Sequence, residues 1–275
     1  MPTLEILDAV LDYDVSGNNG PLVVQLHGLT SSRARDASLG LDMGRALRDH
    51  RVLRYDARGH GMSSGTPDPA RYTWPALAGD LLALLDEVAP GEQVHGVGGS
   101  MGTGTLLHAA LRDPNRFASL TLVTPSTAWE TRKAKAGSYR DNADLVERKG
   151  IDAFVDIGRS MSEPPALAGA PHSRPNVSEK LLPSVLRGAA LSNLPPIQEI
   201  TKLEVPTLIL AWADDPDHPL KTSELLHKSI KGSRLVVART PYGIMAWPAL
   251  FADEVSAVDA ALEESAQGAQ EIDAA

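Results

Sequence analysis

The chemical feature that stands out is the pentapeptide Gly98–Gly102, which reads Gly-Gly-Ser-Met-Gly. An apolar run precedes it and a helix-forming run follows it, so Ser100 is predicted to lie on a tight strand-to-helix turn. Such a turn strains the serine backbone, and glycines at positions 98 and 102 leave room for it. The hydroxyl would then stand at a helix N-terminus, where backbone N–H groups favour developing negative charge. This context predicts a nucleophile rather than an incidental serine in a glycine-rich turn.

Acyl transfer through a serine needs three further groups: a base for the hydroxyl proton, a group that orients this base, and donors for the oxyanion. The chain contains no cysteine, which excludes a thiol nucleophile, a disulfide and a cysteine metal site. It also lacks a cofactor fingerprint, so hydride and phosphoryl transfer are not indicated and no cofactor is expected.

The elements that would hold the serine alternate between strands and helices. Expected strands are Thr3–Leu7, Val10–Val15, Leu22–Leu26, Arg51–Tyr55, Gln93–Val97, Ser119–Val123, Thr207–Trp212 and Arg234–Ala238. Expected helices are Leu39–Leu47, Trp74–Val88, Met101–Leu111, Thr222–Ile230 and Pro248–Leu262. This alternation predicts an α/β fold with a mostly parallel, twisted sheet and helices on both of its faces.

The alternation stops after Pro125. Helical stretches at Asn142–Arg148 and Ile151–Met161 follow, with a segment rich in proline, glycine and alanine and without a strand signal. We therefore expect an inserted helical cap over residues 127–195.

The length of 275 residues suits one large domain with a substantial core. We expect residues 1–126 and 196–264 to form the α/β core. The polar, alanine-rich residues 265–275 are expected to be a disordered tail.

Charge and hydropathy narrow the range of partners. The formal net charge of −9 argues against nucleic acid and anionic membranes. No apolar run approaches the roughly 18 residues that would span a bilayer, and no signal peptide is visible. We expect a cytoplasmic protein that acts on a small-molecule substrate, and its oligomeric state stays open.

Several segments together resemble the α/β-hydrolase family, especially its enol-lactonase and esterase-like members. His27-Gly28 resembles the family's oxyanion loop, and Asp56–Ser63 resembles its D-x-R-G-x-G-x-S loop. Gly98–Gly102 matches the nucleophile elbow, and Pro206–Leu210 followed by Asp214–Pro219 resembles the strand and loop that carry the acid. The resemblance covers most of the chain apart from the cap and implies the α/β-hydrolase fold.

The resemblance also implies roles for individual residues. Ser100 would be the nucleophile, with the backbone N–H groups of Leu29 and Met101 as oxyanion donors. The family's spacing between the acid and a proline points to Asp215, with Asp214 as the alternative. The acidic loop could also suggest a metal site, but one histidine beside contiguous aspartates gives no convergent geometry, so no metal is expected.

The chain departs from the family at the catalytic histidine. The family has Gly-His just after the last strand, whereas Ile244 follows Gly243 here. Ile244 therefore marks the position of an absent histidine and is expected to face Ser100 across the pocket floor, close to the Asp215 carboxylate. His218 is the best substitute base, but it should not reach Ser100, because a residue three positions after the acid must turn back over its own loop.

Two functions remain open, because losing one triad member costs a serine hydrolase several powers of ten in rate. The first is a serine hydrolase that acts on a small ester or lactone with an incomplete Ser-Asp-His triad. The second is a non-hydrolytic pocket protein on the same fold, such as a pseudoenzyme, a lyase or a cyclase. The elbow at Ser100 favours the first function, and Ile244 favours the second.

Overall fold

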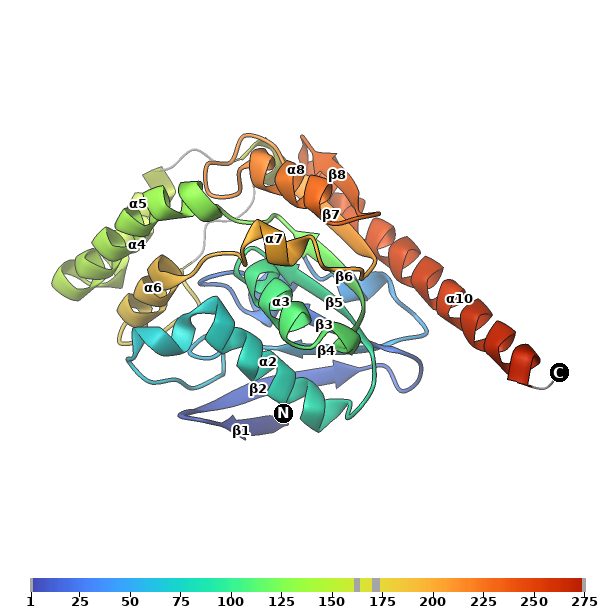
Figure 1. The fold of residues 1–275 in the computed structure, drawn as a ribbon. Coiled ribbons are helices and arrows are strands. Elements are labelled where there is room, and N and C mark those ends of the chain that lie inside the picture. Colours follow the sequence, from blue (N-terminus) through green and yellow to red (C-terminus); the bar gives the residue numbers. More distant parts are fainter. Residues whose placement is uncertain (1, 161–163, 170–173, 274–275) are drawn as a thin grey trace.

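A computed structural model of the chain describes residues 2–160, 164–169 and 174–273 (Figure 1). One eight-stranded sheet runs through it in the order β1-β2-β4-β3-β5-β6-β7-β8. Pairings that involve β2 are antiparallel and the others are parallel. The strands are β1 (Thr3–Ile6), β2 (Ala9–Ser16), β3 (Leu22–Leu26), β4 (Arg51–Tyr55), β5 (Val94–Gly99), β6 (Phe117–Val123), β7 (Thr207–Trp212) and β8 (Arg234–Ala238). The predicted α/β class with a mostly parallel sheet is confirmed.

The central strands are mostly apolar and are buried because helices cover both faces of the sheet. Every residue of β3, β6 and β7 is buried. Neighbouring residues of one strand enter different cores: Leu22 and Val24 pack in one cluster, and Val23 packs in the other. The first core includes α2 (Trp74–Val88), α3 (Met101–Arg112) and α8 (Leu220–Ser229), whereas the second includes α10 (Trp247–Asp273).

Helices fill the segment between β6 and β7, where a cap is expected. They are α4 (Trp129–Lys149), α5 (Ile151–Ser160), η4 (Pro165–Leu167), α6 (Leu182–Leu191) and α7 (Ile197–Ile200). Figure 1 shows α4, α5 and α6 grouped at one end of the sheet. Residues of α4, α5 and α6 form a third apolar cluster with Tyr72. Met161, the last residue of the predicted helix Ile151–Met161, lies outside the described residues, and the cap boundaries 127–195 stay a prediction.

The predicted helix Leu39–Leu47 is wrong. The structure has α1 (Arg33–Ser38) and then a short 3-10 helix, η1 (Met43–Ala46). The Ser32 hydroxyl caps α1 by accepting a hydrogen bond from the Arg35 N–H. Gly40, at φ +73°, has a backbone conformation that a regular helix does not contain. The α-helix in this region therefore ends just before the segment in which the sequence predicted one.

The C-terminal region also differs from expectation. α10 continues to Asp273, so most of the segment 265–275 is helical instead of a disordered tail, and residues 274 and 275 lie outside the described part. Alanine, glutamate and glutamine, which are strong helix formers, are frequent in this segment. In Figure 1, the last turns of α10 project away from the sheet. The remaining short helices are η2 (Pro69–Tyr72), η3 (Pro114–Arg116) and α9 (Pro241–Met245).

None of the helices within the described ranges combines the length and apolar character that a membrane crossing requires.

Candidate active site

Ser100 occupies the turn between β5 and α3, as predicted. Its backbone has φ +50° and ψ −103°, a strained conformation for a residue with a side chain. A Cβ at position 98 would lie 2.7 Å from the carbonyl carbon of Gly102, and one at position 102 would lie 2.9 Å from the Leu26 Cβ. Packing at the turn therefore requires both glycines.

Hydrogen bonds to the neighbouring strand hold this turn in place. The Ser100 N–H donates to the Val123 carbonyl at 2.9 Å. The buried Thr103 hydroxyl lies 2.9 Å from the Gly98 carbonyl and 3.2 Å from that of Val123. The strain at Ser100 is thus stabilised from both sides of the turn, which fixes the direction of its hydroxyl.

The predicted acid lies on the loop after β7. Asp215 accepts hydrogen bonds from the Trp212 indole N–H at 2.8 Å and from the Asp217 backbone N–H at 2.8 Å. Burial alone opposes ionisation, but the hydrogen bond and charge of His218, together with these donors, lower the pKa of Asp215 to about 2. Asp215 is therefore ionised at neutral pH. Its neighbour Asp214 is exposed and has φ +59°.

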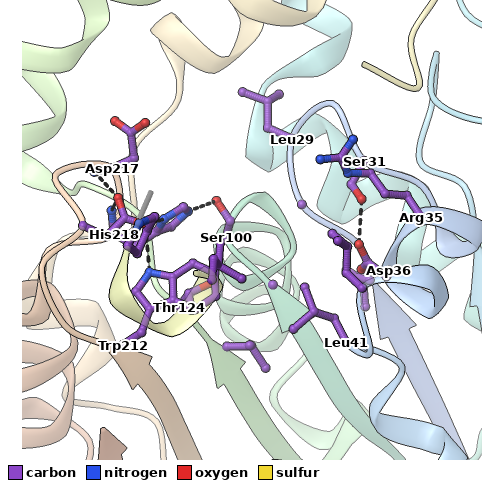
Figure 2. A pocket seen from close by; sticks show the side chains of 18 of the residues that line it. Leu29, Ser31, Arg35, Asp36, Leu41, Ser100, Thr124, Trp212, Asp217 and His218 are labelled. Atoms are coloured by element: carbon purple, nitrogen blue, oxygen red, sulfur yellow. Dashed lines mark hydrogen bonds and ion pairs between the residues drawn. The ribbon is translucent and has the colours of Figure 1, made fainter. Parts of the chain in front are cut away.

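His218 lies between the acid and the serine (Figure 2). Its Nδ1 is 2.7 Å from Asp215 Oδ2, and its Nε2 is 2.9 Å from the Ser100 Oγ. An ionised carboxylate can only accept, so Nδ1 carries the proton and Nε2 presents its lone pair. The serine hydroxyl can then donate to Nε2, which is the hydrogen bond that a general base needs.

The expectation that His218 would not reach Ser100 is wrong. The Asp215 Oδ1 accepts the backbone N–H groups of Asp217 and His218, at 2.8 and 3.3 Å, and this turns the chain back over the carboxylate. The imidazole also packs edge-on against Trp212, with ring centroids 5.6 Å apart. The spacing of three residues, which argued against a relocated base, is what closes the turn.

Ile244 does not face Ser100 as expected. It lies on α9, is 7% exposed, and belongs to the apolar core with Trp247 and Phe251. The described residues that line the pocket at Ser100 do not include it. The Asp215 carboxylate is directed to His218 rather than to Ile244. That Ile244 marks the family's histidine position stays a prediction.

Of the two expected oxyanion donors, Met101 directly follows the serine and Leu29 lines the same pocket. Met101 is the first residue of α3, so its N–H has no partner within the helix. Leu29 and Gly28 line the same pocket as Ser100, and a Cβ at position 28 would lie 3.6 Å from the Ser100 Cβ. The roles of the Leu29 and Met101 N–H groups remain a prediction that this proximity supports.

His27 stabilises the loop that carries Leu29. One ring nitrogen, Nδ1, is 2.8 Å from the Gly28 carbonyl, and the other, Nε2, accepts the Ala57 N–H at 2.9 Å. Burial lowers the pKa of His27 to about 4, so the ring is neutral. A neutral ring has one donor and one acceptor, which matches the two bonds.

The Asp56–Ser63 loop, whose Ala57 N–H bonds to His27, has a structural role. Asp56 accepts the backbone N–H groups of Arg33 and Met62, at 3.0 and 2.9 Å. Arg58 forms a bidentate ion pair with Asp80. These contacts join the loop to α1 and α2.

A pocket of about 310 Å³ opens at Ser100, within the range of small-ligand sites. Much of its lining is apolar, including Leu41, Val97 and Trp212. The side across from Ser100 and His218 is polar and contains Ser31, Arg35 and Asp36 (Figure 2). The sequence analysis missed these three residues, because no motif or periodicity marks them as site residues.

A second cluster could in principle hold a metal ion. His50, His95 and Asp259 place one ligand atom each within 4.8 Å of one another. His95 lies near the start of β5, whereas Ser100 follows the end of this strand, so the cluster is at the opposite edge of the sheet. The expectation of no metal at the acidic loop is not tested.

Comparison with known proteins gives a consistent family and fold. A family model described as alpha/beta hydrolase fold matches residues 21–149. The 3-oxoadipate enol-lactonase 2 of Acinetobacter baylyi is 29% identical over 195 residues, which cover 68% of this chain and 69% of the enol-lactonase. The crystal structure of a hydrolase from Pseudomonas aeruginosa PA01 is 26% identical, with a TM-score of 0.77 over 94% of this chain and 97% of that one.

A further solved structure agrees in fold. The enol-lactonase from Burkholderia xenovorans LB400 has a TM-score of 0.73 at 23% identity and covers 94% of this chain and 98% of its own. At this level of identity the likeness concerns the fold alone.

Proposed function

Since the chain belongs to the α/β-hydrolase fold family, with hydrolases among its relatives, we propose that it is a serine hydrolase acting on a small ester or lactone. Ser100, His218 and Asp215 form its catalytic triad, with the base on the same loop as the acid. The single observation that carries this proposal is the 2.9 Å contact between His218 Nε2 and the Ser100 Oγ. It supplies the base that the isoleucine at position 244 cannot supply.

In the acylation step, the Ser100 Oγ attacks the carbonyl carbon of the substrate as His218 Nε2 takes the hydroxyl proton. The developing oxyanion accepts hydrogen bonds from the N–H groups of Leu29 and Met101. The ionised Asp215 stabilises the imidazolium. When the C–O bond breaks, the proton on Nε2 passes to the leaving alkoxide, and the acyl group stays on Ser100.

Deacylation uses the same groups with water as the nucleophile. His218 Nε2 accepts a proton from water while the water oxygen attacks the acyl carbon. Collapse of the second tetrahedral intermediate breaks the bond to the Ser100 Oγ, which recovers its proton from the imidazolium. In a lactone, the alcohol and the acid are parts of one molecule, so the product is a single hydroxy acid.

The pocket supports a small substrate. Its volume of about 310 Å³ and largely apolar lining suit a compact acyl or lactone group. The name enol-lactonase, carried by two relatives and a solved structure, supports lactones and esters as the first compounds to test.

A fluorophosphonate probe and a neutral 4-nitrophenyl ester test this function directly. The wild-type protein should be labelled at Ser100 and should hydrolyse the ester. His218→Ala should lower kcat/KM by roughly 10⁴-fold or more, since the nucleophile loses its base. Ile244→His should give no gain, because position 244 faces the core.

Other results would contradict the proposal. Full activity in His218→Ala would mean that another group is the base. A large gain in Ile244→His would mean that position 244 can still hold the catalytic histidine of the family. If the wild-type protein is not labelled and does not hydrolyse the ester, the non-hydrolytic pocket protein would be favoured.

A further inference from the structure

We propose that the wall of the pocket opposite Ser100 is an anion subsite, in which Arg35, with the Ser31–Asp36 pair beside it, binds a carboxylate carried by the substrate. The inference rests on the proposed function, because the same ligand must reach Ser100 with its ester carbonyl. Its chemical class is the monoester of a short dicarboxylic acid.

Arg35 is a half-buried cation without a carboxylate partner among the residues that the structure describes. Within the described ranges, its guanidinium donates one hydrogen bond, to the Arg174 carbonyl at 3.4 Å. By contrast, the partly buried Arg54 and the buried Arg58 pair with Asp42 and Asp80. A guanidinium has five N–H donors, so Arg35 retains donors that can reach a ligand in the pocket it lines.

Asp36 supplies an independent indication of a ligand. Its side chain lines the pocket at 7% exposure, and Oδ1 accepts the Ser31 hydroxyl at 2.6 Å. Oδ2 has no hydrogen-bond partner within the described ranges. This oxygen is not among the fully buried unpartnered atoms of the described residues, so it is accessible from the pocket and available to a ligand.

The charge state of Asp36 is set by its surroundings. Burial raises its pKa to about 7, although Ser31 and Arg35 oppose the rise, and the carboxylates of Asp42 and Asp56 add to it. Around neutral pH the group therefore passes between a neutral carboxyl, which can donate to a ligand anion, and a carboxylate, which repels one.

Position relative to the nucleophile fixes the shape of the ligand. Figure 2 shows Arg35 and Asp36 on one side of the pocket and Ser100 with His218 on the other. Apolar side chains such as Leu41 and Val97 lie among the remaining lining residues. A ligand that uses both sides has an ester at one end, a methylene chain in the middle and an anion at the other end.

The test measures binding without turnover, in the Ser100→Ala variant, by calorimetry. Monomethyl glutarate provides the anion, and the matched neutral ligand is its amide, methyl 4-carbamoylbutanoate. The acid should bind about tenfold to a hundredfold more tightly than the amide below pH 7, as expected for hydrogen bonds to a charged group. Adding Arg35→Gln should remove this preference. Arg174→Gln is the matched control, because Arg174 pairs with Asp152 and is absent from the pocket lining given by the described residues.

Proton linkage provides a second readout. Affinity for the acid should fall as pH rises through about 7, and binding above that pH should take up a proton. Replacing Asp36 by Asn in the same background should reduce this pH dependence. Equal affinity for acid and amide, or an unchanged preference in Arg35→Gln, would overturn the subsite.

Hydrolysis assays separate the two proposals. Turnover of neutral esters without any preference for the acid would remove the subsite and leave the hydrolase function. A clear preference in binding, together with no hydrolysis by the wild-type protein, would leave the subsite and remove the proposed function.

Discussion

Among the residues that the structure describes, two Ser-His-Asp arrays have nearly the same internal distances. In one, His218 lies 2.9 Å from the Ser100 Oγ and 2.7 Å from Asp215. In the other, His95 lies 2.8 Å from the Ser119 Oγ and 2.9 Å from Asp259. These two distances therefore do not distinguish a candidate active site from a buried polar network.

The surroundings of the two serines differ instead. Ser119 is 1% exposed within the regular strand β6, so a substrate has no access to it. Ser100 lies on a strained turn, beside the first N–H of α3 and next to a pocket. Access to a pocket and a position at a helix N-terminus, rather than the hydrogen-bonded relay alone, distinguish the first array from the second.

The second array joins elements together. Asp259 on α10 accepts hydrogen bonds from both His95 on β5 and His50 before β4, at 2.9 and 2.8 Å. Burial lowers the pKa of His95, although the Asp259 carboxylate opposes this shift. The array thus ties the C-terminal helix to the amino-terminal edge of the sheet, and its expected contribution is to stability.

The largest expected difference between the arrays is in turnover. Ser100→Ala should lower kcat by roughly 10⁴–10⁶-fold, because the covalent route is lost. Ser119→Ala should leave kcat close to the wild-type value and keep fluorophosphonate labelling. An ester assay beside probe labelling measures both, and a labelled Ser119 would break the comparison.

The carboxylates provide the next largest contrast. Asp215→Asn should reduce kcat by roughly 10³–10⁴-fold, since an amide does not hold the imidazole in the same tautomer or stabilise its positive charge. Asp259→Asn should leave kcat unchanged and lower the midpoint of thermal unfolding. Steady-state kinetics and calorimetric unfolding separate the two roles, and equal kcat losses would contradict them.

Stability should show the reverse order from turnover: loss of the His95 imidazole should lower the free energy of unfolding more than loss of the His218 imidazole. His95→Ala leaves a cavity and breaks two hydrogen bonds in a site that is 1% exposed, so unfolding free energy should fall by about 2–4 kcal/mol. The His218 side chain is 20% exposed, so His218→Ala should lower the free energy of unfolding by about 1 kcal/mol or less. Urea denaturation measures both, and a larger loss in His218→Ala would show that the catalytic loop also supports the fold.

The last contrast concerns the Asp36 carboxyl on the pocket wall. Its folded-state pKa of about 7 lies above the ordinary value of 3.8, so the folded protein binds more protons than the unfolded chain between these values. This group should therefore make stability fall as pH rises from about 4 to about 7, by at most about 1.4 kcal/mol per pH unit. Asp36→Asn should reduce that slope in denaturation curves measured across this range, and an unchanged slope would assign it to other groups.

Much of the fold followed from local patterns. The strands Leu22–Leu26 and Thr207–Trp212 and the helix Trp74–Val88 were predicted with the bounds that the structure has. Buried parallel strands read as short apolar runs, and the helix has regular apolar spacing. The turn at Ser100 was also predictable, because glycines at 98 and 102 are required by contacts within a few residues or on the adjacent strand.

The triad and the pocket wall needed the tertiary structure. The residues Asp215 and His218 were both recognised as candidates, but their relation to Ser100 depends on a loop that turns back through backbone hydrogen bonds to its own carboxylate. The contact joins positions 118 residues apart, which no local spacing reports. Ile244 was assigned to the pocket by analogy of position, whereas packing on Trp247 directs it into the core.

The sequence by itself determined the α/β sheet, the strained serine turn and the absence of thiol chemistry, since each depends on residue types or on neighbours close along the chain. Only the tertiary structure decided which histidine meets the serine, which Ser-His-Asp array has access to solvent and ligand, and which charges line the pocket. Those outcomes depend on how distant segments pack. A change in the direction of one loop moves a side chain by more than the length of a hydrogen bond, without any change in the sequence pattern.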